Sequence, residues 1–195
     1  MRLVVGLGNP GAEYRASRHN LGFRVVEVLA ERRGLALGEP FCGALVARGD
    51  GLLLAAPQTY MNRSGFAVRC LVEHEAPAAE EILVVFDDLA LPLGRLRLRS
   101  EGGPGGHRGL ASVLEQLRTD AVPRLRLGVG APPPGAEVAE WVLGPFLPEE
   151  EEAVAAMVER AADACEAWLR EPLGAVAARV NAPPLAVAVD GGPEA

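Results

Sequence analysis

Residues 82–118, ILVVFDDLALPLGRLRLRSEGGPGGHRGLASVLEQLR, contain the succession of elements that decides the fold. The apolar run at 82–87 predicts a buried strand, and the alternation of arginine with leucine at 95–99 predicts a strand with one basic face. A glycine-rich loop then leads into apolar residues at helical spacing over 107–118. Strands that alternate with helices in this way predict an α/β protein with helices packed on a sheet.

The same alternation extends along the rest of the chain. Further strands are predicted at 2–8, 44–48, 52–56 and 124–130, and further helices at 21–33, 62–74 and 149–170. A length of 195 residues suits one domain with a sizeable core. We expect this domain to span 1–181, followed by a loose Pro- and Gly-rich tail over 182–195. Segment 131–145 fits a mobile flap and a plain surface crossover equally well.

Cysteine usage and hydropathy indicate a cytoplasmic protein. Cys42, Cys70 and Cys165 are far apart and lack metal-ligand spacing, so reduced thiols and no structural zinc are expected. The chain shows no basic and apolar leader, and no apolar run approaches the length of a membrane span. We therefore expect no membrane partner.

Charge is distributed unevenly along the chain. The formal net charge of −7 argues against simple nonspecific binding to nucleic acid. However, segment 94–128 holds seven arginines and three acidic residues, whereas segment 136–171 holds ten acidic residues and two arginines. A basic face and an acidic back would suit a polyanion that binds on one side only.

Uncharged polar side chains gather at three places. Of the 17 Asn, Gln, Ser, Thr, His and Tyr residues, 12 fall in segments 9–22, 57–65 and 99–110. Such groups cost desolvation energy unless they find partners, so their clustering favours a binding or catalytic surface. The first two segments follow predicted strands, and Asp87 closes a third strand. Because ligands of open α/β sheets bind at the carboxyl ends of strands, one common cleft is predicted there.

His19 is the candidate general base of this cleft. An imidazole base needs a carboxylate that fixes its tautomer and raises its basicity, and Asp87 or Asp88 can supply one. No serine occupies a nucleophile elbow and no cysteine neighbours a candidate base, so water is the predicted nucleophile. His19, His107 and the aspartates could also bind a metal, but no ligand spacing supports this, and we predict no metal.

Two glycine-rich stretches carry different predictions. GLGNPG at 6–11 matches the dinucleotide fingerprint formally, but Pro10 favours a loop in which Asn9 presents its amide. The loop at 100–107 opens a helix beside Arg97 and Arg99, which predicts a phosphate clamp. The alternative for these arginines is an exposed face on an edge strand.

Four motifs, GLGNPGAEYRASRHNLG, PQTYMNRSG, VVFDDLALPLG and GGPGGHRGL, resemble in order and spacing those of bacterial peptidyl-tRNA hydrolases. The resemblance runs from residue 1 to about residue 180. It implies a single-domain, three-layer α/β/α fold with a mixed twisted sheet. It also implies hydrolysis of the ester between a peptide and the 3′ ribose of tRNA, by a monomer that uses neither metal nor cofactor. The expected partner is peptidyl-tRNA.

The resemblance also implies roles for individual residues. His19 would be the general base, Asp87 would stabilise its basic form, and Asn9 would read the peptide side and help to exclude free aminoacyl-tRNA. The expected contacts to the rest of the substrate are Met61 and Asn62 in the site, Tyr14 and Tyr60 near the terminal nucleotide, and Arg99 and Arg126, with Arg97 nearby, at the 5′ phosphate.

Two positions depart from the family pattern. Arg108 stands where the family usually has an asparagine, and a guanidinium can donate but cannot accept. Ala90 stands where a second aspartate is usual. Relatives that keep this fold without catalysis bind RNA, which leaves a noncatalytic RNA-binding protein as the alternative, and a nucleotide-dependent enzyme is a third class. The joint presence of Asn9, His19, Asn62 and Asp87 favours catalysis.

Overall fold

A mixed sheet of seven strands forms the centre of the protein. The computed structural model describes residues 1–183, so the predicted tail lies outside the described residues from 184 onward. The strand order is β2-β3-β4-β1-β5-β7-β6. The strands are β1 (Arg2–Gly6), β2 (Glu39–Phe41), β3 (Ala44–Gly49), β4 (Leu52–Pro57), β5 (Ile82–Asp88), β6 (Leu96–Arg99) and β7 (Arg124–Gly128).

Parallel and antiparallel pairs share this sheet. The central strand β1 pairs in parallel with β4 and β5, and β5 pairs in parallel with β7. The outer pairs β2–β3, β3–β4 and β6–β7 are antiparallel. All six predicted strands are present. The short edge strand β2 was not predicted, because its three residues Glu-Pro-Phe carry too little pattern.

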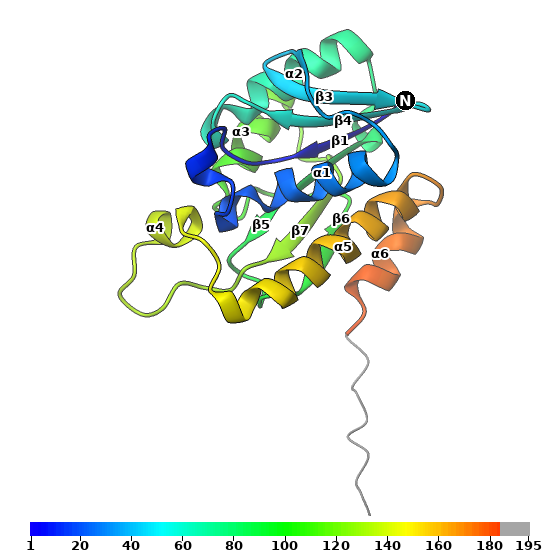
Figure 1. Cartoon of the computed structure of the whole chain (residues 1–195). Coiled ribbons are helices and arrows are strands. Elements are labelled where there is room, and N and C mark those ends of the chain that lie inside the picture. The colour runs from blue at the N-terminus through cyan, green and yellow to red at the C-terminus, as the bar shows by residue number, and fades with distance from the viewer. Residues whose placement is uncertain (184–195) are drawn as a thin grey trace, which may run out of the picture.

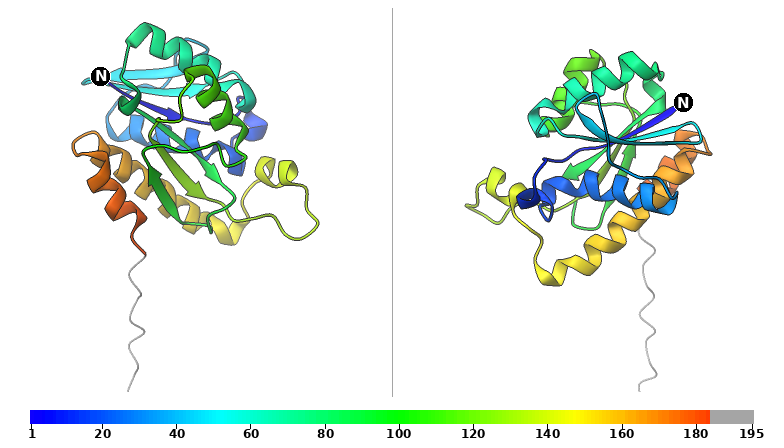
Figure 2. Two further views of the ribbon diagram at one scale, coloured as in Figure 1. Left: turned by 180° about the vertical axis from the view of Figure 1, so that it is seen from behind. Right: turned by 45° about the horizontal axis from the view of Figure 1, so that its top comes forward.

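Helices cover both faces of the sheet. They are α1 (Leu21–Arg32), α2 (Ser64–Glu75), α3 (Arg108–Leu117), α4 (Val138–Leu143), α5 (Glu151–Trp168) and α6 (Leu173–Asn181). Figure 1 and the two views of Figure 2 show α1, α5 and α6 on one side, with α2 and α3 on the other. The predicted three-layer α/β/α fold is therefore confirmed. None of the described helices combines the length and apolar character needed to cross a membrane.

Five short 3₁₀ helices complete the described elements: η1 (Ala12–Tyr14), η2 (Arg18–Asn20), η3 (Met61–Arg63), η4 (Ala79–Glu81) and η5 (Pro148–Glu150). The four predicted helices correspond to α1, α2, α3 and α5 within a few residues. Sequence patterns did not predict α6, and segment 131–145 contains the short helix α4 within irregular backbone.

Two apolar cores, one on each face of the sheet, hold the layers together. One core joins the sheet to α1, α5 and α6, and the other joins it to α2 and α3. The contact of α1 with β1 is so close that a Cβ on Gly6 would lie 2.0 Å from the Gly22 carbonyl oxygen. The Phe23 ring likewise fills the space beside Gly8. Gly6 and Gly8 of GLGNPG therefore allow α1 to pack closely against this strand and the loop that follows it.

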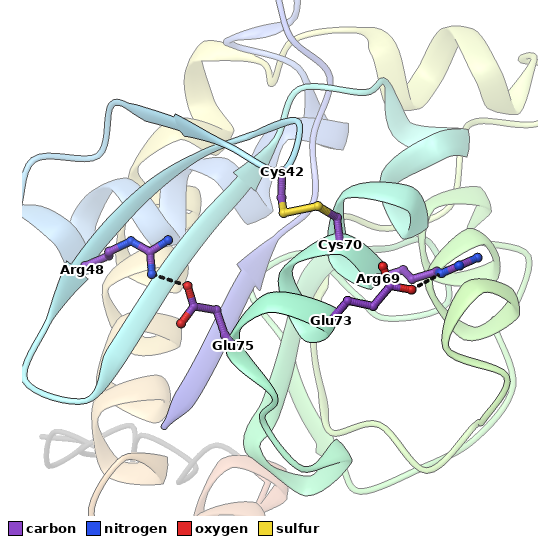
Figure 3. Close-up of a disulfide and its surroundings, with 6 residues drawn as sticks. All are labelled: Cys42, Arg48, Arg69, Cys70, Glu73 and Glu75. Carbon is purple, nitrogen blue, oxygen red and sulfur yellow. Dashed lines mark hydrogen bonds and ion pairs between the residues drawn. A yellow bond between two sulfur atoms is a disulfide. The ribbon is translucent and has the colours of Figure 1, made fainter.

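The expectation of three reduced cysteines is wrong for two of them in this structure. Cys42, in the β2–β3 turn, forms a disulfide with Cys70 of α2, 28 residues away (Figure 3). The two cysteines are far apart in the sequence, and they meet only because the fold places the turn at the sheet edge against α2. The sequence pattern therefore could not predict this pair. Cys165 remains a free thiol and is buried, and burial raises its pKa to about 12.

Candidate active site

The three polar segments converge at one edge of the sheet, where β1, β4 and β5 end. A cavity of about 740 Å³ lies there. Its lining includes Asn9 after β1, Tyr60, Met61 and Asn62 after β4, Asp87 and Asp88 at the end of β5, and His19 and His107. The topology thus brings together side chains that lie up to about a hundred residues apart in the sequence.

His19 contacts Asp87 directly. Its Nδ1 lies 2.8 Å from Asp87 Oδ1 and 3.0 Å from Oδ2. The Asp87 side chain is only 2% exposed, whereas that of His19 is 13% exposed. Because ionised Asp87 only accepts, Nδ1 of a neutral His19 carries the proton. Nε2 is then left as an unprotonated acceptor, and no hydrogen-bond partner holds it among the described residues.

His107 is the second partner of Asp87. Its Nε2 lies 3.1 Å from Asp87 Oδ1, the oxygen that also contacts His19, and the two imidazole centroids are 4.9 Å apart. His107 Nδ1 accepts from the Leu110 backbone N–H at 3.1 Å, capping α3. Because Nδ1 accepts, the proton of neutral His107 is on Nε2, which therefore donates to Asp87.

These contacts explain the ionisation of Asp87. Burial alone would raise the pKa of its carboxyl. The charge and hydrogen bond of His107, together with the hydrogen bond of His19, outweigh burial and hold the pKa well below its ordinary value. Asp87 is therefore a carboxylate throughout the pH range in which imidazoles titrate.

Asn9 is fixed with its amide nitrogen free. Its Oδ1 accepts from the Met61 backbone N–H at 2.7 Å, which settles the orientation of the amide. Asn20 holds the Asn9 backbone through two hydrogen bonds of 2.8 and 2.9 Å. The Nδ2 group of Asn9 has no partner among residues 1–183, so it can donate to a ligand in the cavity.

Residues 60–62 form the opposite wall. Tyr60 has a φ of 60° and a ring that is 55% exposed, and Met61 is buried beside Asn9. A left-handed backbone is uncommon for a tyrosine and costs energy, so the fold holds this residue in a defined orientation. Asn62 is exposed at the cavity. Sequence reasoning had named all three residues.

A second cavity of about 500 Å³ opens between the glycine loop 102–105 and strands β6 and β7. Cross-strand partners share one face of a sheet, and Arg97 opposes Arg126 while Arg99 opposes Arg124. Arg99, Arg124 and Arg126 line this cavity, and Arg97 is exposed beside it. Four of the seven arginines in the predicted basic segment therefore share one face of β6 and β7, which we call the arginine face.

The four arginines are not equivalent. Buried Arg124 donates to the carbonyl oxygens of Val122, Asp120 and Gly102, so it supports the glycine loop, and burial lowers its pKa. Arg126 pairs with Asp88 at 2.5 Å. Because Asp88 also lines the first cavity, this pair links the arginine face to the site of His19.

Arg18 secures the segment that carries α4. Its guanidinium stacks 3.7 Å from the Trp141 ring centroid, bonds the carbonyls of Gly144 and Pro145, and pairs with Glu150 at 2.8 Å. The buried Arg18 precedes His19, so one short helix serves both the base and the α4 wall of the cavity. Sequence reasoning missed both Arg18 and the pairing of His107 with Asp87.

The remaining named residues lie apart from this centre. Arg108 is exposed on the cavity rim at the first residue of α3, and Ala90 lines the cavity where a second carboxylate was expected. Tyr14 is half-buried in η1 and is not among the residues that line either cavity. Its predicted contact with a nucleotide therefore stays a prediction.

His19, Asp87 and His107 could also bind a metal ion, because each offers one possible ligand atom. One ligand atom from each lies within 4.8 Å of the others. Metal binding here would displace the two protons that the histidines direct at Asp87. Metal-free chemistry stays a prediction, which chelation can test.

The fold and this cavity define an α/β enzyme with a carboxylate-supported histidine, a site of the hydrolase type. The sequence model of the peptidyl-tRNA hydrolase family matches residues 3–187. The chain belongs to the peptidyl-tRNA hydrolase family.

Relatives and solved structures agree with this assignment. A peptidyl-tRNA hydrolase of Chloroflexus aurantiacus is 46% identical over 186 residues, which cover 93% of this chain and 99% of the relative. One from Halalkalibacterium halodurans is 43% identical over 176 residues, or 88% and 95% of the two chains. The crystal structure of the Acinetobacter baumannii peptidyl-tRNA hydrolase matches with a TM-score of 0.87 at 34% identity, covering 93% of this chain and 95% of that one.

Proposed function

We propose that this peptidyl-tRNA hydrolase cleaves the ester between peptide and tRNA with a water molecule that His19 activates. The observation that carries this proposal is the orientation of His19. Asp87 holds its Nδ1 and leaves Nε2 free at the cavity. Among the residues described as lining the cavity there is no serine or cysteine, so a hydroxyl or thiol nucleophile of the serine- or cysteine-hydrolase type has no candidate there.

The protons can be followed through the reaction. Nε2 of His19 removes a proton from water as the water oxygen attacks the ester carbonyl. The resulting imidazolium then returns a proton to the 3′ oxygen of the leaving ribose. Asp87 stays ionised and stabilises the imidazolium between these steps. His107 donates a second hydrogen bond to Oδ1 of Asp87.

Asn9 supplies discrimination for the peptide. Its free Nδ2 can donate to the peptide carbonyl that follows the ester in a peptidyl-tRNA. Free aminoacyl-tRNA has no such carbonyl and carries an ammonium instead, which leaves the buried donor unpaired at a cost of about 1–3 kcal/mol. We infer that this cost favours N-blocked substrates.

The arginine face holds the nucleic acid. Arg99 and Arg126 line the second cavity, whose volume accommodates a phosphate, and Arg99 has no acidic partner among the described residues. We infer that these two side chains hold the 5′ phosphate of tRNA, with Arg97 beside them. Helix α5, which carries five of the ten acidic residues of segment 136–171, packs on the opposite face of the sheet and disfavours RNA there, whereas Glu137 of the same segment lines the first cavity.

A monomer in the cytoplasm is sufficient for this function, because every residue of the proposed site comes from a single chain and tRNA is a cytoplasmic substrate. The experiment that tests the function is release of peptide from a purified N-acylaminoacyl-tRNA, with and without a chelator. Release that is unaffected by the chelator supports water activation by His19 alone. Binding of tRNA without release would favour the noncatalytic RNA-binding alternative.

A further inference from the structure

The disulfide Cys42–Cys70 lies outside the catalytic cavity and has a histidine beside it. One ring nitrogen of His74 and the two sulfur atoms lie within 4.8 Å of one another. Cys70 and His74 are four residues apart on α2 and therefore share one face of the helix. Both cysteine side chains are half-buried and His74 is exposed, so solutes can reach this group.

Residues 60–62 form one wall of the active-site cavity. The two cysteines lie in the two segments that hold this wall in place, the β2–β3 turn and α2. On one side, Gly43, next to Cys42, accepts a hydrogen bond from the Gln58 N–H at 2.8 Å. On the other side, α2 begins at Ser64, whose hydroxyl bonds the carbonyl oxygens of Tyr60 and Met61. The disulfide therefore closes a loop that contains the whole wall.

Figure 3 shows how the disulfide bridges the β2–β3 turn and α2. An ion pair links Arg48 of β3 to Glu75 of α2, while Arg69 and Glu73 pair within α2. Both ion pairs are exposed and contribute little to stability. Beside the apolar packing of Phe41 against α2, the disulfide is therefore the covalent constraint on the turn relative to the helix.

We propose that Cys42 and Cys70 form a reversible dithiol–disulfide site that sets how firmly the Tyr60–Asn62 wall is held. The proposal rests on the proposed function in one respect, because it takes this wall to bind the substrate. Disulfides of cytoplasmic proteins are usually transient and sense redox conditions. The buried Cys165 does not compete for exchange, since its thiol is inaccessible.

The co-reactant is a low-molecular-weight disulfide, and the step balances as thiol–disulfide exchange. One cysteine thiolate attacks a sulfur of the reagent and releases one thiolate, leaving a mixed disulfide on the protein. The second cysteine thiolate attacks the protein sulfur of that mixed disulfide and releases the other reagent thiolate. Two electrons pass from the cysteines to the reagent, and the two protons pass to its two thiols. His74 is placed to accept a cysteine proton and so to increase the thiolate fraction.

Thiol titration of the unfolded protein tests the chemistry. After oxidised glutathione, one free thiol per chain is expected, and after dithiothreitol three are expected. His74→Gln should slow oxidation without changing either endpoint. A count of three thiols after exposure to oxidised glutathione would overturn the proposal, as would a count of one that dithiothreitol cannot change.

Kinetics of the same two forms test the coupling. The reduced protein should have a KM for N-acylaminoacyl-tRNA about three- to tenfold higher, because substrate must then order the wall, while kcat stays unchanged. The double variant Cys42→Ser/Cys70→Ser should match the reduced parent and should not respond to the oxidant. Equal KM values for the two forms, or a change in kcat alone, would contradict the coupling.

Two further outcomes are distinguishable. If EDTA added to the reduced protein reproduces the effect of the oxidant, the three side chains bind a metal ion and the redox assignment is wrong. If neither form releases peptide, the proposed function fails, whereas the thiol count still decides whether the redox pair exists.

Discussion

His107 and His19 bond the same oxygen of Asp87, at 3.1 and 2.8 Å. The carboxylate therefore serves two imidazoles, and His107 competes with His19 for its charge. The Leu110 N–H also donates to Nδ1 of His107, which holds this histidine at the N-terminus of α3. The negative charge of Asp87 is thus divided between His19 and His107.

This competition predicts opposite shifts of the acidic limb in the pH–rate profile. Asp87→Asn removes the charge that stabilises the His19 imidazolium, so the limb should move to lower pH. His107→Asn keeps a side chain that can cap α3 but is too short to reach Asp87. More of the carboxylate charge then acts on the His19 imidazolium, and the limb should move to higher pH. Shifts of the acidic limb in the same direction for both variants would contradict the proposed competition of His19 and His107 for Asp87.

Asn9 can be tested with a substitution that keeps its structural contact. Asn9→Asp retains the oxygen that accepts from Met61 N–H but loses the Nδ2 donor. The ratio of kcat/KM between N-acylaminoacyl-tRNA and free aminoacyl-tRNA should fall about 5- to 100-fold, the equivalent of an unpaired donor. An unchanged ratio would place discrimination elsewhere in the cavity.

Arg99 and Arg126 should affect tRNA binding and spare the chemistry. Arg99→Ala and Arg126→Ala should raise KM for full-length substrate and reduce its log–log dependence on salt by about 0.7–0.9 for each phosphate that the protein no longer neutralises. A short substrate with only the 3′ nucleotide and its peptide should be processed normally. Arg170→Ala, an exposed arginine in the acidic segment, is the matched control. An equal loss of activity on the full-length and the short substrate would show that these arginines act in folding or in the catalytic centre.

Arg18 should contribute to stability and to the α4 wall. Arg18→Met removes the guanidinium that donates to the Pro145 carbonyl and pairs with Glu150, and the free energy of unfolding should fall by about 2–4 kcal/mol. The exposed Arg15→Met is the control and should change stability by less than about 0.5 kcal/mol. Denaturant titration measures both variants. Similar losses in the two variants would show that the contacts around Arg18 are dispensable.

The sequence predicted the sheet and the neighbourhood of the site because those depend on local patterns. The strand 82–87 ends in Asp87, and polar residues follow β1 and β4, so the cleft could be placed from strand ends alone. The contact of His107 with Asp87 could not be predicted in this way. It depends on the path of the glycine loop, which brings the start of α3 next to the end of β5. The disulfide Cys42–Cys70 and the contacts of Arg18 with Trp141 and Glu150 are likewise tertiary contacts. Each joins segments that are far apart in the sequence, and no local sequence pattern predicts that they meet.

The most direct test of the central claim is the single-turnover rate of peptide release by His19→Ala compared with the parent, at saturating N-acylaminoacyl-tRNA. We expect the rate to fall by about 10²–10⁴-fold, because general-base catalysis acts in the transition state. The affinity for substrate should remain within about threefold, because proton transfer to His19 is a transition-state interaction. A near-normal rate in this variant would contradict the assignment of His19 as the base.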